Sequence, residues 1–128
     1  MNVVMLRGRL AAVPSDRRLP DGSIVWSFDL STPTDEGRMS VPVVSQGDDR
    51  IATWVVGAEV FVTGTARRRF FRTAGGTQSR TEIVARHVSL VGPNGPGVRA
   101  WRQAWAALGE DDLVTLRSGL GALPGVPT

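Results

Sequence analysis

Apolar and polar side chains alternate with a period of two along much of the first 92 residues, a pattern typical of β-strands with one buried face. The clearest run covers residues 24–32, where Trp26 and Phe28 fall on the apolar face and Ser27 and Asp29 on the polar one. We therefore expect Trp26 to lie in a core and not to contact a ligand.

The same pattern predicts four further strands. They cover residues 3–10, residues 39–45, a segment that begins at Glu59 and continues into an arginine-rich region, and residues 80–91. Gly8 interrupts the first of these strands and predicts a bend. Turn-forming residues are concentrated at 14–22, 33–37 and Gly75-Gly76.

Residues 48–56 predict a short helix, because Asp48 and Asp49 suit its amino end and Gly57 follows as a stop. Its expected buried face consists of Ile51, Trp54 and Val55. Five strands with one helix between the third and fourth is the element order of an OB-fold, a small Greek-key barrel. We therefore expect an all-β protein, with a five-stranded OB-fold barrel over residues 1–92 and one short helix between strands 3 and 4.

The composition changes after Gly92. Residues 93–97 consist of Gly, Pro and Asn and predict a linker, whereas residues 98–128 predict a C-terminal helical extension. Apolar side chains at helical spacing predict an interface formed by Trp101, Trp105 and Leu108. Three partners for this stripe are open: the protein's own barrel, a second subunit in a homo-oligomer, or another protein.

Four arginines surround two adjacent phenylalanines in residues 67–72. Arginine supplies fixed positive charge for phosphates, and phenylalanine supplies a ring on which a base can stack, so the segment indicates a surface for single-stranded nucleic acid. Strand alternation places Arg67, Arg69 and Phe71 on one face and Arg68 and Phe70 on the other. The candidate binding residues are Phe71, Arg67, Arg69, Arg72, Phe70, Arg68, Arg80, Arg9 and Arg38.

The charge distribution favours the same location. Residues 1–64 hold six arginines against eight carboxylates, a net charge of −2, while residues 65–92 hold six arginines against one carboxylate, a net charge of +5. A basic patch on a nearly neutral body is typical of an electrostatic binding surface. A charged strand edge that prevents aggregation is the alternative interpretation, and the two phenylalanines favour the binding surface.

Composition argues against an enzyme, a metal site and a cofactor. The chain has no cysteine, no lysine and only His87 as a histidine, and it contains no phosphate-binding loop or nucleophile motif. Arg7 and Arg9 interrupt the apolar amino terminus, so it lacks the pattern of a signal peptide, and no stretch reaches membrane-spanning length. We therefore expect a cytoplasmic protein without a membrane partner.

Several short segments resemble, in order and with compatible spacing, the bacterial single-stranded DNA-binding protein family. They are residues 2–10 with Pro14, residues 20–22 with 26–30, residues 41–44 with Gly47, residues 57–60 with Gly64, and residues 81–85 with Val88 and Gly92. This resemblance implies a homo-oligomer, usually a tetramer, that coats single-stranded DNA without strong sequence preference during replication, repair or recombination, and needs no cofactor. It also implies base stacking by Phe71, which falls at the family's aromatic position in the last hairpin.

The chain departs from that family at three places. Ser40 and Gln46 occupy positions where the family commonly has aromatic rings, the loop 33–37 has no aromatic residue, and the last residues lack an acidic tip. We therefore expect weaker and more salt-dependent binding, and recruitment of replication or repair proteins is an open question. Two alternatives follow: an OB-fold module that binds protein, for instance as the regulator of a conventional single-strand coat protein, or an RNA-binding protein. A dimer is an alternative to the tetramer.

Overall fold

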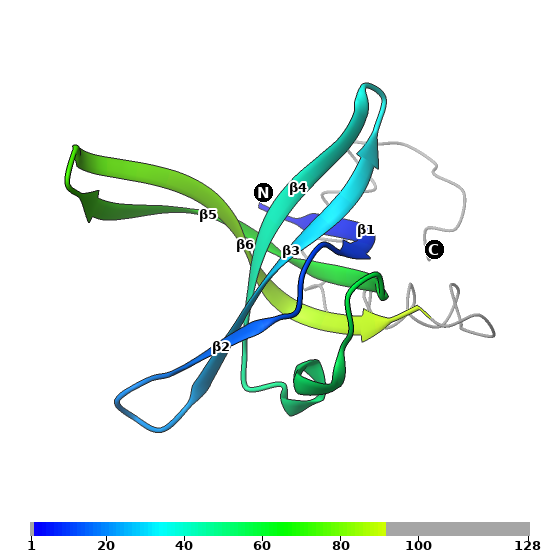
Figure 1. Ribbon diagram of the computed structural model, residues 1–128, viewed down its shortest axis with the longest axis horizontal. Helices are drawn as coiled ribbons and strands as arrows, with labels where there is room; N and C mark the ends of the chain where they lie inside the picture. The colour runs from blue at the N-terminus through cyan, green and yellow to red at the C-terminus, as the bar shows by residue number, and fades with distance from the viewer. Residues whose placement is uncertain (1, 92–128) are drawn as a thin grey trace.

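In the computed structural model, which describes residues 2–91, one β-sheet closes on itself (Figure 1). Its strands are β1 (Val4–Leu10), β2 (Ser15–Arg18), β3 (Ile24–Thr34), β4 (Gly37–Gln46), β5 (Glu59–Thr73) and β6 (Gly76–Leu90), with one short 3₁₀ helix, η1 (Asp49–Thr53). The strand order is β1-β5-β6-β4-β3-β2, and an additional pairing of β1 with β3 closes the ring. The prediction of an all-β protein is confirmed.

The ring closes where β1 lies between β5 and β3. Gly8 is opposite Val60 on β5, and Leu10 is opposite Leu30 on β3. A Cβ atom at Gly8 would lie 2.7 Å from the carbonyl oxygen of Ser31. The glycine that interrupts the apolar pattern is therefore the residue that lets the backbones approach closely enough to close the sheet.

The interior of the ring is apolar. Its buried members are Leu10, Trp26, Phe28, Leu30, Val43, Ile51, Trp54, Val60, Val62, Ile83 and Val88. The rings of Phe28 and Trp54 meet edge to face, with centroids 5.7 Å apart, an arrangement that aromatic pairs favour. Trp26 is only 9% exposed, so the prediction that it belongs to the core is confirmed.

Two sequence predictions about connections are wrong. Residues 15–18 were expected to form part of a turn, but they form β2, a sixth strand, whose four side chains are all exposed. Its pairing with β3, from Ser15 opposite Ser27 to Arg18 opposite Ile24, stabilises a strand that its polar sequence does not indicate. The loop predicted at residues 33–37 is shorter in the structure, because β3 and β4 stay paired as far as Thr34 and Gly37.

The predicted helix at 48–56 is present in shortened form. It is a 3₁₀ helix of five residues, and the carboxylate of Asp48 caps it by accepting a hydrogen bond of 3.1 Å from the backbone N–H of Arg50. Ile51 and Trp54 are buried as expected. Val55 was expected on the buried face, but it follows the helix and is 66% exposed, because the helix ends before a second turn can form.

A bulge separates the barrel part of the β5–β6 pair from its outer part. Thr63 is opposite His87, but Gly64 is opposite Ala85, so Arg86 is an extra residue on β6. A Cβ atom at Gly64 would lie 2.0 Å from the carbonyl oxygen of Val84. The close crossing of the two backbones at the bulge therefore requires a glycine.

Beyond this bulge, residues 67–82 form a two-stranded ribbon that projects from the barrel (Figure 1). We call this ribbon the arm. Its tip is a two-residue turn between Thr73 and Gly76, which confirms the turn predicted at the paired glycines. At its base, the side-chain amide of Asn2 donates to the carbonyl of Ala66 at 2.7 Å and accepts from its N–H at 2.8 Å. The start of the chain is thus fastened to the base of the arm.

Some sequence predictions concern parts of the chain outside residues 2–91. They are the linker at 93–97, the helical extension at 98–128 and the interface formed by Trp101, Trp105 and Leu108. Within the described part, no helix has the length and apolar character needed to cross a membrane.

Candidate nucleic-acid interface

The arm presents two chemically different faces. Residues directly opposite each other on paired strands share a face, and the register pairs Arg67 with Glu82, Arg69 with Arg80, and Phe71 with Gln78 on the first face. The second face carries the pairs Arg68–Thr81, Phe70–Ser79 and Arg72–Thr77. The division of the arginines and phenylalanines between faces is the one that strand alternation predicts.

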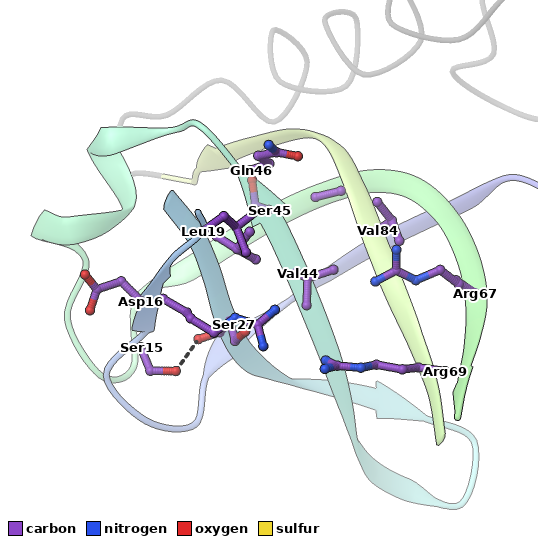
Figure 2. A pocket seen from close by; sticks show the side chains of 13 residues that line it. Ser15, Asp16, Leu19, Ser27, Val44, Ser45, Gln46, Arg67, Arg69 and Val84 are labelled. Carbon is purple, nitrogen blue, oxygen red and sulfur yellow. Dashed lines mark hydrogen bonds between the residues drawn. The ribbon is translucent and has the colours of Figure 1, made fainter. Parts of the chain in front are cut away.

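The first face continues into a hollow on the outer surface of the sheet (Figure 2). This hollow has a volume of about 560 Å³ and lies between β2 and the base of the arm, over β3 and β4. The side chain of Arg67 extends from the arm toward Val84, and that of Arg69 extends toward Val44 (Figure 2). Its lining residues are Ser15, Asp16, Arg17, Leu19, Val25, Ser27, Val44, Ser45, Gln46, Arg67, Arg69, Val84 and Ala85.

The hollow combines an apolar floor with a polar rim. Val25, Val44 and Val84 supply aliphatic surface from three different strands. Ser27 supplies a hydroxyl, and the exposed Gln46 supplies an amide that donates a hydrogen bond of 3.3 Å to the Ser23 hydroxyl. Such a surface suits a flat ring with polar edges.

Arg67 is held by a buried carboxylate. Its Nη2 lies 2.6 Å from Oε1 of Glu82, whose side chain is fully buried, whereas the side chain of Arg67 is 55% exposed. The other oxygen, Oε2, has no hydrogen-bond partner and lies 3.8 Å from Nη2 of Arg80. Because a buried charge requires a counter-charge, Glu82 neutralises Arg67 and fixes its position at the rim of the hollow.

Three of the arm arginines carry uncompensated charge. Among residues 2–91, no carboxylate forms an ion pair with Arg68, Arg69 or Arg72. Arg69 is also directly opposite Arg80, a like-charge pair of a kind that is unfavourable in a sheet. The arm therefore attracts anions through these side chains more than through Arg67.

Both phenylalanines of the arm are accessible. Phe70 is 67% exposed and Phe71 is 37% exposed, although large apolar side chains usually avoid water. Phe71 lies on the same face as Arg69, and Phe70 lies on the opposite face. A nucleic-acid strand that followed the first face would therefore contact Arg69 and then Phe71.

Two of the candidate binding residues lie elsewhere. Arg9 donates to the Gly57 carbonyl at 3.0 Å and lies 3.9 Å from a Glu59 carboxylate oxygen. Arg38 donates to the hydroxyl and carbonyl of Ser31, at 2.7 and 2.8 Å. Ser31 is four residues from Ser27 along β3, about 13 Å at the usual rise of a strand, so the structure does not bring these two arginines to the hollow.

Sequence reasoning missed the opposite wall and the floor of the hollow. The outward positions of β3 follow from its alternation, but Ser27 attracts no attention because it is small and polar. β2 has no apolar pattern, so Ser15 and Arg17 gave no signal that they would line the hollow. Only the closed sheet brings these residues together with Arg69.

No protein-family model matches the sequence, and a search of curated proteins found no match. Within residues 2–91, no cluster of three or more histidine, aspartate or glutamate side chains is arranged to hold a metal ion. The functional assignment therefore depends on the arm and the hollow.

Proposed function

We propose that the protein is an OB-fold member of the bacterial single-stranded DNA-binding protein family and that it binds single-stranded DNA without strong sequence preference. The observation that carries the proposal is the hollow between β2 and the arm, which Arg67 and Arg69 line. OB-folds bind oligonucleotides on the face of their second and third strands, between the loop that follows the first strand and the last hairpin. In this proposal β3 and β4 correspond to those two strands, β2 to the loop and the arm to the last hairpin.

Affinity in this proposal comes from two sources. The uncompensated arginines of the arm, Arg68, Arg69 and Arg72, neutralise phosphates and release counterions. Phe71 and the more exposed Phe70 offer rings on which bases stack, whatever the sequence of the strand.

The outward face of β4 offers little stacking surface. Ser40 and Gln46 are both exposed there, and Ser40 is opposite Ser31 on β3. Each stacked base contributes roughly 1–3 kcal/mol, so aromatic rings absent from these two positions weaken binding by several powers of ten relative to a family member that has them. Electrostatics then contributes a larger share, and we expect a weak affinity that falls steeply with salt.

A titration of fluorescein-labelled oligothymidine at 50 and 200 mM salt tests the proposal. We expect saturable binding that weakens as salt rises, and weaker binding to a duplex of the same length. Affinity that does not respond to salt, or equal affinity for the duplex, contradicts it. Oligouridine of the same length separates RNA from DNA, because discrimination depends on contacts to the 2′-hydroxyl.

The polar β4 face favours one second candidate, an OB-fold module that binds protein as the regulator of a conventional single-strand coat protein. In that case the wild-type protein shows no preference for single strands over duplex at moderate salt. We extend the main proposal, by the family resemblance alone, to a cytoplasmic homo-oligomer that acts in DNA replication, repair or recombination. Light scattering on the full chain tests whether it is a tetramer or a dimer.

A further inference from the structure

We propose that the Arg67–Glu82 pair is a stacking platform for one nucleobase in the hollow, and that Arg69 beside it is a phosphate ligand. This inference rests on the proposed function, because it assigns separate tasks to two arginines of the same binding surface. Arginine can serve either purpose: its guanidinium plane stacks on bases, and its charge pairs with phosphate.

The ion pair with Glu82 makes Arg67 a poor ligand for phosphate. A phosphate that displaced Glu82 from its 2.6 Å contact would leave a fully buried carboxylate with only the distant Arg80 as its counter-charge. Leaving a buried charge unpaired is strongly unfavourable. Arg67 therefore keeps its partner when the DNA strand binds, so its charge stays neutralised while the flat face of its guanidinium can contact a base.

A fixed platform stacks at low entropic cost. Arg67 is anchored through one nitrogen, while its side chain is 55% exposed at the rim of the hollow (Figure 2). A free arginine loses rotamer freedom when it orders against a base, but the ion pair has already restricted Arg67. The pair thus supplies a stacking surface in the hollow, where Gln46 supplies no aromatic ring.

The hollow has the character of a base site. Its volume of about 560 Å³ falls in the range of pockets for small organic ligands. The aliphatic floor of Val25, Val44 and Val84 suits the face of a base, and Ser27 and Gln46 at the rim suit its polar edge. A phosphate directly over the valine side chains would lose water of hydration without a donor beneath it, so we expect the phosphate at the edge of the hollow beside Arg69.

Arg69 lines the same hollow as Arg67, but its charge is not neutralised. It has no carboxylate partner among residues 2–91, and it is directly opposite the like-charged Arg80. A phosphate beside Arg69 reduces this repulsion. Bound DNA therefore reduces the repulsion between Arg69 and Arg80, whereas the charge of Arg67 is already neutralised by Glu82.

Lysine substitutions distinguish base stacking from phosphate binding, because lysine is positively charged but lacks the planar guanidinium group. We expect Arg67→Lys to weaken oligothymidine binding roughly fivefold to tenfold, with an unchanged slope of log affinity against log salt. We expect Arg69→Lys to retain affinity within about threefold, and Arg69→Gln to reduce the magnitude of the slope by about 0.7. Thermal melting of each variant establishes that it is folded.

An abasic oligomer of the same length, with phosphates but no bases, is the matched ligand. On it, Arg67→Lys should bind as tightly as the wild type, while Arg69→Gln should still bind more weakly. Glu82→Gln supplies a second measurement if Arg67→Lys does not fold. It releases the charge of Arg67, so the salt slope of oligothymidine binding should become steeper by about 0.7.

Each other outcome overturns a specific claim. If the wild type binds oligothymidine but Arg67→Lys binds equally tightly, or if its loss persists on the abasic strand, Arg67 is not a stacking platform. A salt slope that Glu82→Gln leaves unchanged also contradicts the inference. If the wild type does not bind oligothymidine at all, the proposed function fails and the inference fails with it.

Discussion

Arg67 on β5 and Glu82 on β6 are directly opposite each other, and one guanidinium nitrogen lies 2.6 Å from an oxygen of the fully buried carboxylate. The pair is asymmetric, because one partner is half exposed and the other has no access to water. This asymmetry determines what happens when either side chain is changed.

We expect Arg67→Ala to lower the free energy of unfolding by about 3–5 kcal/mol, because it leaves a buried carboxylate without its main counter-charge. Glu82→Gln should cost less, about 1 kcal/mol, since the amide oxygen can still accept a hydrogen bond and Arg67 can be hydrated. Urea unfolding of the two variants measures the difference. Equal losses would show that burial of Glu82 does not determine the energy of the pair.

The bulge at the base of the arm depends on Gly64. A methyl group there would lie 2.0 Å from the carbonyl oxygen of Val84, a backbone atom that cannot move alone. We expect Gly64→Ala to destabilise the fold by about 3 kcal/mol or more. Gly75→Ala is the matched control, because the nearest atom to its new methyl would be 4.0 Å away, and chemical unfolding should show little change. Equal stability of the two variants would mean that the strands can separate at the bulge without cost.

Aromatic residues of the core and the arm should show opposite phenotypes. Trp54→Ala removes the buried ring that contacts Phe28 and should cost about 3–5 kcal/mol of stability. Phe71→Ala should leave stability nearly unchanged and weaken oligothymidine binding roughly tenfold. Phe70→Ala removes the exposed ring on the other face of the arm, so comparison of the two variants shows how stacking is divided between the two faces. Undiminished binding by Phe71→Ala would remove this residue from the interface.

Stability should decrease in acid through two surface ion pairs. The hydrogen bond from the Arg50 side chain lowers the pKa of Asp48, and the hydrogen bond from Arg7 lowers the pKa of Glu59. A carboxylate whose pKa is lower in the folded state stabilises the fold above its ordinary pKa, about 4, and this contribution is lost as the pH falls through the lowered value.

Melting temperatures between pH 6 and pH 3 measure this effect. We expect a smaller decrease below pH 4 for the double variant Asp48→Asn, Glu59→Gln than for the wild type. Asparagine keeps the ability to cap η1, so the comparison isolates charge from capping. Parallel melting curves for the two proteins would show that other carboxylates cause the acid sensitivity.

The sequence predicts those strands in which buried and exposed side chains alternate regularly. In β3 every second side chain from Trp26 to Leu30 is buried, so alternation alone identifies both the strand and its faces. β2 could not be predicted in this way, because its four side chains are all exposed and only backbone pairing with β3 stabilises it. The helix at 48–56 was overestimated because Trp54 is buried through its contact with Phe28 and not through helical periodicity.

The candidate site was predictable in composition but not in arrangement. The mixture of arginine and phenylalanine locates the arm, and alternation divides its faces. The partner of Arg67 depends on the turn: a shift of one residue at Gly75-Gly76 would place Glu82 on the other face. The hollow requires β2, β3 and β4 to lie beside the arm, which no local pattern contains.

The extra residue at Arg86 allows β6 to present Ile83 and Val88 to the same core, although they are five positions apart. Strict alternation would put them on opposite faces. Deleting Arg86 would remove the bulge: Ile83 and Val88 would then be four positions apart, so a regular strand would still present both to the core and keep Glu82 opposite Arg67, but the bend between the barrel and the arm would be lost. Replacing the exposed side chain of Arg86 leaves the bulge in place. The direction in which the arm leaves the barrel thus depends on the number of residues at this point of β6 and not on the side chain that occupies it.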